Sequence, residues 1–142
     1  MSRARFHVLS LTALLAGLLG CGSPAGPSDL IGTWQGSGRE FASVLVRFAP
    51  DGGFHLEYVD AKGERQELTG DYEADFTKAP VPLSLRKIKQ LPHSLHTIVE
   101  FDSADTLRMG GFAPRWKLRP VAFDPDAVIR LERRLGDAGT TS

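Results

Sequence analysis

The sequence predicts an all-β domain over residues 30–135, an antiparallel eight-stranded meander barrel or half-barrel that follows a cleaved N-terminal segment. From Leu30 onward, apolar residues recur with period two, which is typical of strands with one core face and one solvated face. Turn residues rich in Gly and Asp separate these runs about every ten residues, as in sandwiches and barrels of hairpin-linked strands. Closure into a barrel is favoured because it removes exposed sheet edges.

The N-terminal segment before that domain has a different pattern. A basic stub at residues 1–7 precedes an almost wholly apolar run at residues 8–19, and Gly20 then stands before Cys21. This order is typical of a secretory signal peptide, here residues 1–20. The apolar run is shorter than the roughly 20 residues of a spanning helix, which disfavours an uncleaved membrane anchor. Ordinary secretion of a soluble protein is the other alternative.

Cys21 is the only cysteine of the chain. A signal peptide that ends directly before a cysteine resembles that of bacterial lipoproteins, with their lipobox. The resemblance implies acyl chains on the thiol and on the new amino group of Cys21, and two or more chains give stable membrane anchoring. Gly22 stands where an aspartate would favour retention in the inner membrane. We therefore expect a lipid-anchored protein of the bacterial cell envelope, on the outer membrane and facing the periplasm.

The ends of the β domain are expected to be flexible, and its charge is balanced. Residues 21–29 continue from Cys21 as GSPAGPSD, a composition that suits a linker and cannot build a core. Residues 136–142 are expected to form a disordered tail. The length between them suits one domain. Basic and acidic residues number 17 each, which argues against a nucleic-acid partner because that partner requires a basic face.

The strands are expected where the alternation of apolar and polar residues is clearest. Glycines in the turns at residues 50–53 and 61–64 supply the positive φ that hairpins need. The segment 125–135 fits either a helix or a strand, and we favour a closing strand because it brings the count to eight. The other strands begin with the Gly-Thr-Trp of residues 32–34 and continue at 44–48, 54–58, 68–76, 82–89, 96–102 and 105–110.

Short motifs in a fixed order resemble the small lipocalin-like domains of bacterial lipoproteins. These motifs are GTW at 32–34, DG at 51–52, G-x-Y at 70–72, DTL at 105–107 and R-P-x-x-F at 119–123. The resemblance implies that Trp34 plugs the closed end of a barrel. It also implies that an arginine, Arg133 or else Arg119, lies over the indole ring in a cation–π contact.

The expected function is binding without catalysis. An eight-stranded barrel is just wide enough for side chains or for one small ligand. Its inward positions are rich in large apolar residues, which favours a filled core over a cavity. We expect a partner that is a small apolar ligand or an envelope protein; the alternative is a packed protein-binding module, such as an inhibitor of a secreted or envelope enzyme. Phe112 and Trp116 are the candidates for an interaction patch, unless Trp116 packs into the core on a strand.

No residue pattern predicts an enzyme, a cofactor or a metal site. The sequence has no G-x-S-x-G nucleophile motif, and acylation would consume its one thiol. His93 and His96 have the spacing of a helical metal-binding pair, but they fall in an expected loop and strand entry, where solvated histidines are the simpler interpretation. His55 is expected on a polar strand surface. Ser84 stands beside no histidine in the sequence.

Overall fold

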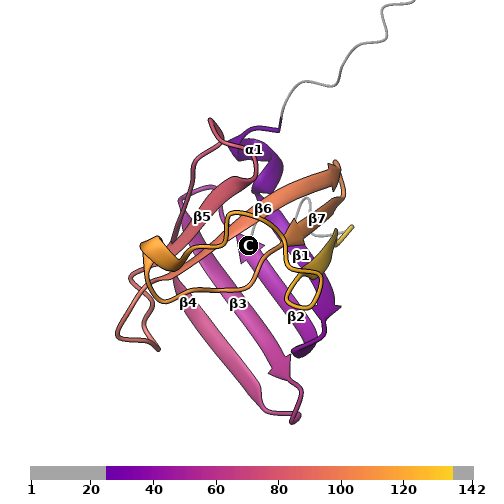
Figure 1. The fold of residues 1–142 in the computed structure, drawn as a ribbon, viewed down its shortest axis with the longest axis vertical. Coiled ribbons are helices and arrows are strands. Elements are labelled where there is room, and N and C mark those ends of the chain that lie inside the picture. Colours follow the sequence, from indigo (N-terminus) through magenta and orange to yellow (C-terminus); the bar gives the residue numbers. More distant parts are fainter. Residues whose placement is uncertain (1–24, 136–142) are drawn as a thin grey trace, which may run out of the picture.

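Residues 25–135, which the computed structural model describes, form a closed antiparallel barrel of eight strands (Figure 1). Each strand pairs with its neighbours in the chain, and β8 pairs with β1. This confirms the predicted all-β class in its closed form. The elements are the helical turn α1 (Pro27–Leu30), β1 (Gly32–Gly38), β2 (Phe41–Phe48), β3 (Gly53–Asp60), β4 (Arg65–Ala74), β5 (Val81–Arg86), β6 (Leu95–Ser103), β7 (Thr106–Met109), the 3-10 helix η1 (Trp116–Leu118) and β8 (Ile129–Arg133).

The segment that fitted either a helix or a strand is the strand β8. Its Ile129 and Leu131 are buried, while Arg130 and Glu132 are exposed. The strand pairs with β7 on one side and with β1 on the other. A strand is preferred here because period two puts both apolar side chains in the core and pairs two open sheet edges.

Closure of the barrel depends on a glycine at the contact between β1 and β8. A Cβ atom on Gly36 would lie 1.8 Å from the carbonyl oxygen of Arg130, so no larger residue fits without moving the backbone. Gly70 of β4 has the same role, since a Cβ there would lie 2.5 Å from the carbonyl oxygen of Arg86. Both glycines permit close approach of the backbones of neighbouring strands.

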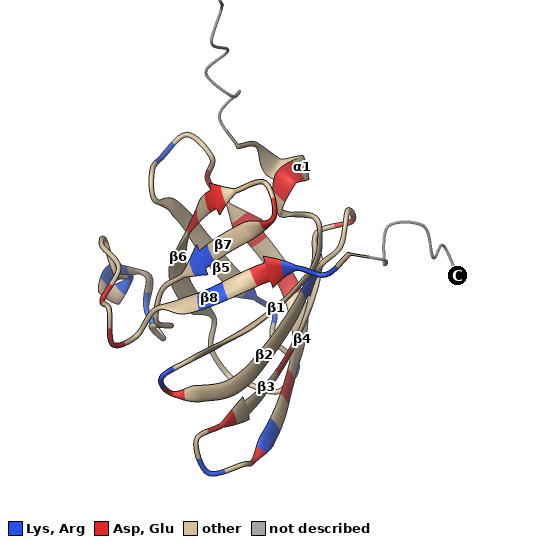
Figure 2. Ribbon diagram, turned by 90° about the vertical axis from the view of Figure 1, so that its right-hand side faces the viewer, with Lys and Arg blue, Asp and Glu red and all other residues tan. Residues whose placement is uncertain are grey.

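The alternation along the strands sends apolar side chains inward and charged ones outward. Acidic and basic residues are interspersed along the strands and turns of the barrel (Figure 2). Full burial of one large apolar side chain contributes about 1.5–3 kcal/mol, so the interior supplies the main stabilisation. The largest side chains that are fully buried are Trp34, Phe48, Leu30, Leu83, Leu85, Leu107, Met109, Ile129 and Leu131.

Residues 27–30 form a helical turn, which corrects the flexible linker expected over 21–29. Pro27 opens the turn with a φ suited to a helix, and the Asp29 carboxylate accepts a hydrogen bond of 2.7 Å from the backbone N–H of Gly26. Leu30 is fully buried, and its carbonyl oxygen accepts a hydrogen bond of 2.9 Å from Nε1 of Trp34. The turn is ordered because it covers one end of the barrel.

The signal peptide, Cys21 and the tail at 136–142 lie outside the described residues, as does the start of the expected linker. None of the helices within residues 25–135 has the length and apolar character that crossing a bilayer requires. The lipid anchor therefore stays a prediction from the sequence.

A long connection between β7 and β8, residues 110–128, crosses the outer face of β5 and β6 (Figure 1). We call it the strap. Its Ala113 exchanges two backbone hydrogen bonds of 2.8 Å with His96 of β6. The strap covers side chains that point away from the barrel interior. Ile98 is one of them, and only 3% of its surface is exposed.

Candidate functional site

The interior of the barrel keeps an apolar cavity of about 210 Å³ at the end opposite α1. This end carries the β1–β2 and β3–β4 turns, the loop from β5 to β6 and the first part of the strap. Its lining contains one hydroxyl group, that of Tyr58, and no charged side chain. The lining residues are Phe41, Val44, Leu56, Tyr58, Leu68, Leu91, Leu95, Phe112 and Ile129.

The cavity corrects the expectation of a completely filled core. Strands contribute the deeper lining, where Leu56 and Leu68 are buried, whereas Leu91 and Phe112 come from loops and are only partly buried. At the rim, the rings of Phe41 and Tyr58 meet edge to face with centroids 5.2 Å apart. Partly buried loop side chains cover this end incompletely, so space remains beneath them.

The opposite end of the barrel is closed by Trp34, which is fully buried. The Arg133 guanidinium lies over the indole, with Cζ 4.3 Å from the ring centroid. Nη1 of Arg133 donates a hydrogen bond of 2.8 Å to the carbonyl oxygen of Ile31, and Nη2 donates one of 2.6 Å to that of Asp29. The Phe101 and Trp34 rings meet in an edge-type arrangement, with their centroids 5.9 Å apart. The structure thus brings together the tryptophan and the first-choice arginine of the sequence analysis.

Arg119, the second-choice partner for Trp34, lies on the outer face instead. Its Nη2 donates to Ser84 Oγ at 2.5 Å and lies 3.2 Å from Nδ1 of His96. Ser84 Oγ is 2.9 Å from the same Nδ1. Because the arginine side chain can only donate hydrogen bonds, Nδ1 of neutral His96 is the acceptor. The three side chains fasten the strap to β5 and β6.

His96 is buried, which corrects its interpretation as a solvated loop histidine. Burial of the imidazole lowers the pKa of His96, and the positive charges of Arg119 and Arg86 lower it further. The group is therefore neutral at pH 7. The sequence separation hid its contact with Ser84, because the two residues become neighbours only through the register of β5 on β6.

The two residues expected in one interaction patch occupy different places on the strap. Phe112 is partly buried at the cavity, whereas Trp116 lies on η1 with 66% of its surface exposed. Core packing of Trp116 on a strand, the alternative, is therefore wrong. Leu118 and Val121 are exposed nearby in the chain, 63% and 87%, and Nζ of Lys117 lies 5.5 Å from the Trp116 ring centroid.

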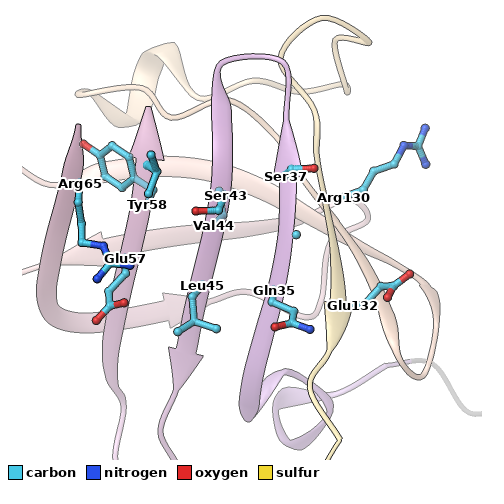
Figure 3. A pocket seen from close by; sticks show the side chains of 12 residues that line it. Gln35, Ser37, Ser43, Val44, Leu45, Glu57, Tyr58, Arg65, Arg130 and Glu132 are labelled. Atoms are coloured by element: carbon cyan, nitrogen blue, oxygen red, sulfur yellow. The ribbon is translucent and has the colours of Figure 1, made fainter. Parts of the chain in front are cut away.

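A larger concavity, about 610 Å³, lies outside the barrel across β8, β1, β2 and β3 (Figure 3). Leu45 and Gln35 belong to its two central strands, β2 and β1. The charged residues at its sides are Arg130 and Glu132 on β8, with Glu57 and Arg65 on β3 and β4. This groove is open to water and edged by both signs of charge. The interior cavity is the better site for an apolar molecule because its walls are desolvated.

Comparison with protein-family models, with curated proteins and with solved structures gives no match for this chain.

Proposed function

We propose that the protein is a lipid-anchored binding protein of the bacterial envelope, whose lipocalin-like barrel holds a small apolar ligand without catalysis. The observation that carries this proposal is the apolar cavity at the open end of the barrel. Its lining offers dispersion and hydrophobic contacts but no charge, so it suits a hydrocarbon-like group. The closed eight-stranded architecture fits a lipocalin-like binding fold.

The cavity volume limits the ligand. A buried apolar cavity of about 150 Å³ already binds benzene, whereas pockets for drug-sized molecules run from about 300 Å³ upward. A volume of about 210 Å³ lies between these values. The proposed ligand is therefore a small aromatic or aliphatic molecule, or one apolar end of a larger molecule that extends past the rim.

The test of this ligand class is native mass spectrometry of protein taken from its own envelope, together with titration of the apolar fluorophore N-phenyl-1-naphthylamine. Leu95→Trp should fill the rim of the cavity and weaken fluorophore binding at least about tenfold, because one large side chain displaces much of the bound volume. Leu135→Trp is the matched control, since Leu135 is 81% exposed. If both variants bind the fluorophore as tightly as the wild type does, the proposal is contradicted.

The anchor at Cys21 needs a separate experiment. Mass spectrometry of the N-terminal peptide from envelope protein should find Cys21 as the first residue, carrying acyl chains. A Cys21→Ala variant should lose the acyl chains and leave the membrane fraction. An intact N-terminus, or an unmodified Cys21 in membrane-bound protein, would contradict lipid anchoring and leave the ligand proposal standing.

One observation favours the alternative, a protein-binding module. Trp116, Leu118 and Val121 expose apolar surface on the strap, and exposed apolar patches mark interaction sites on many soluble proteins. If this function is correct, native mass spectrometry should find a stoichiometric bound protein. Trp116→Ala should then release that protein, whereas Leu95→Trp should leave it bound. If the Trp116→Ala variant still retains the bound protein, the alternative is contradicted.

A further inference from the structure

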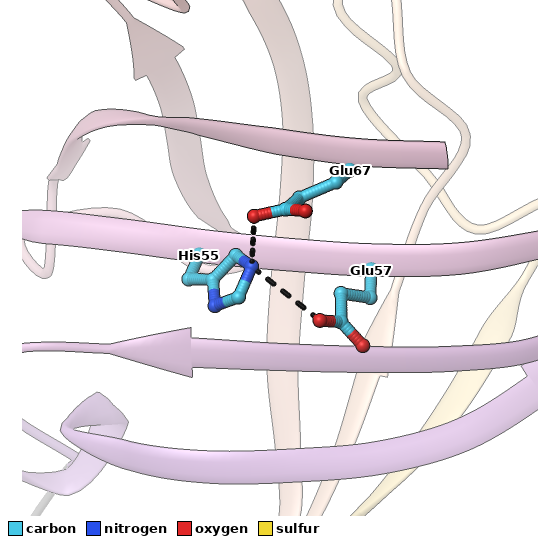
Figure 4. A group of neighbouring side chains, drawn as sticks. All are labelled: His55, Glu57 and Glu67. Carbon is cyan, nitrogen blue, oxygen red and sulfur yellow. Dashed lines mark ion pairs between the residues drawn. The ribbon is translucent and has the colours of Figure 1, made fainter. Parts of the chain in front are cut away.

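One imidazole and two carboxylates meet on the outer face of β3 and β4 (Figure 4). His55 and Glu57 lie two residues apart on β3, so both point to the same face of the strand. Glu67 of β4 lies directly opposite Glu57 in the strand register. All three side chains belong to regular strands, which hold their Cα atoms in place.

The ligand atoms of these residues are close enough to share one ion. Nε2 of His55 lies 2.8 Å from an oxygen of Glu67 and 3.6 Å from an oxygen of Glu57. One ligand atom from each residue lies within 4.8 Å of the others. Metal–ligand bonds of about 2.0–2.2 Å in tetrahedral geometry separate neighbouring ligand atoms by about 3.3–3.6 Å. Small side-chain rotations would therefore bring the three atoms around one ion.

The electrostatics of this cluster favour a cation between the carboxylates. Glu57 and Glu67 form a directly opposed pair of like charges, an arrangement that destabilises a sheet. Nε2 of His55 is shielded from water, although much of the side chain is exposed, and it makes no hydrogen bond of acceptable geometry within residues 25–135. A shared metal ion would offset the repulsion and accept the lone pair of Nε2 of His55.

We propose that His55, Glu57 and Glu67 form a zinc-binding site on the outer surface of the barrel, independent of the apolar cavity. Imidazole nitrogen suits zinc and related transition metals, whereas calcium and magnesium prefer oxygen ligands alone. Three protein ligands would leave one position of a tetrahedral zinc ion for water or another ligand. Glu57 also lines the outer groove, so this position adjoins a surface where another ligand could bind.

The test is zinc titration of untagged, chelator-treated protein by calorimetry, with native mass spectrometry for stoichiometry. A Cys21→Ser background removes the one thiol that could bind zinc elsewhere. We expect one zinc ion per chain, with affinity reduced at least about tenfold in His55→Gln and in Glu67→Gln, since each loses a direct ligand. Addition of zinc should also shift the NMR signals of the His55 ring more than those of the His93 ring.

Matched controls separate the site from nonspecific zinc binding. His93→Gln removes another exposed histidine, and Glu64→Gln removes an exposed carboxylate from the nearby β3–β4 turn. Both controls should bind zinc as the wild type does. The three cluster side chains are partly exposed, so His55→Gln should leave the thermal unfolding midpoint of the metal-free protein nearly unchanged. Glu67→Gln should not lower this midpoint, because it removes the repulsion with Glu57. Absence of zinc binding, or an equal loss in the control variants, would overturn the proposal and leave only a surface ion-pair cluster.

Discussion

The two ends of the barrel are covered in different ways by the same eight strands. At the closed end, Trp34 is fully buried and Arg133 joins the last strand to the backbone before the first, with directional hydrogen bonds. At the open end, Phe112 and its neighbours give apolar contacts that leave about 210 Å³ unfilled. A barrel of this size can thus concentrate its stability at one end and keep a binding cavity at the other.

The largest effect should come from the closed end. Trp34→Ala should lower the free energy of unfolding by about 3–5 kcal/mol, because a large fully buried side chain leaves a cavity. Urea unfolding followed by circular dichroism measures this loss. Trp116→Ala is the control and should stay within about 0.5 kcal/mol of the wild type, since that ring is mainly exposed. Equal effects of the two variants would remove the distinction between a structural and a surface tryptophan.

Arg133→Lys should have the next largest effect, a decrease of about 1.5–3 kcal/mol in the free energy of unfolding, measured in the same way. Lysine keeps the charge but cannot supply the two diverging donors that bind the carbonyl oxygens of Ile31 and Asp29. Arg130→Lys lies on the same strand with its side chain outside, so its effect should be near zero. If both substitutions cost the same, the guanidinium geometry is not what closes this end.

A truncation at the open end should be milder. Phe112→Ala removes a partly buried ring that already borders a cavity, so the expected loss is about 1–2 kcal/mol, below the cost of a fully buried aromatic residue. Binding of N-phenyl-1-naphthylamine should change in this variant, whereas Arg133→Lys should leave it unaltered. A loss of stability as large as that of Trp34→Ala would contradict the proposed difference between the ends.

The smallest effect should be a pH dependence at the strap, which carries Phe112 to the open end. The pKa of His96 is lowered in the folded protein, so the unfolded chain binds more protons at acidic pH. The contribution of His96 to stability is therefore fully present above about pH 6.5, and it is lost as the pH falls from there through the pKa of His96 in the folded protein. Urea unfolding at several pH values should show that the free energy of unfolding falls less steeply toward acidic pH in His96→Gln than in the wild type. An identical fall in both proteins would contradict the lowered pKa of His96.

The elements with strong local patterns were predictable from the sequence. Alternation in residues 44–48 and 54–58, with glycines between them, predicted β2 and β3, and both apolar sets are inward. The ordered turn at Pro27–Leu30 was missed because its composition matches a linker. Its order comes from burial of Leu30 and from bonds to Trp34 and Arg133, which are tertiary contacts.

The candidate sites were less predictable. Phe41, Leu91 and Leu95 line the cavity, yet only the closure of the barrel brings these distant residues together. The pairing of Ser84 with His96, like the opposition of Glu57 and Glu67, follows from strand register. Register depends on all the pairings around the barrel, and a local pattern does not contain that information.

By itself, the sequence determined the strand periodicity, the turn positions and the likeness of residues 1–21 to a lipoprotein signal, because each depends on neighbouring residues in the chain. Only the tertiary structure decided that the barrel closes, that one end stays unfilled, and that the strap buries His96 while exposing Trp116. The physical reason is that closure, cavities and clusters depend on contacts between residues far apart in sequence, whose geometry is set by the register of the whole sheet.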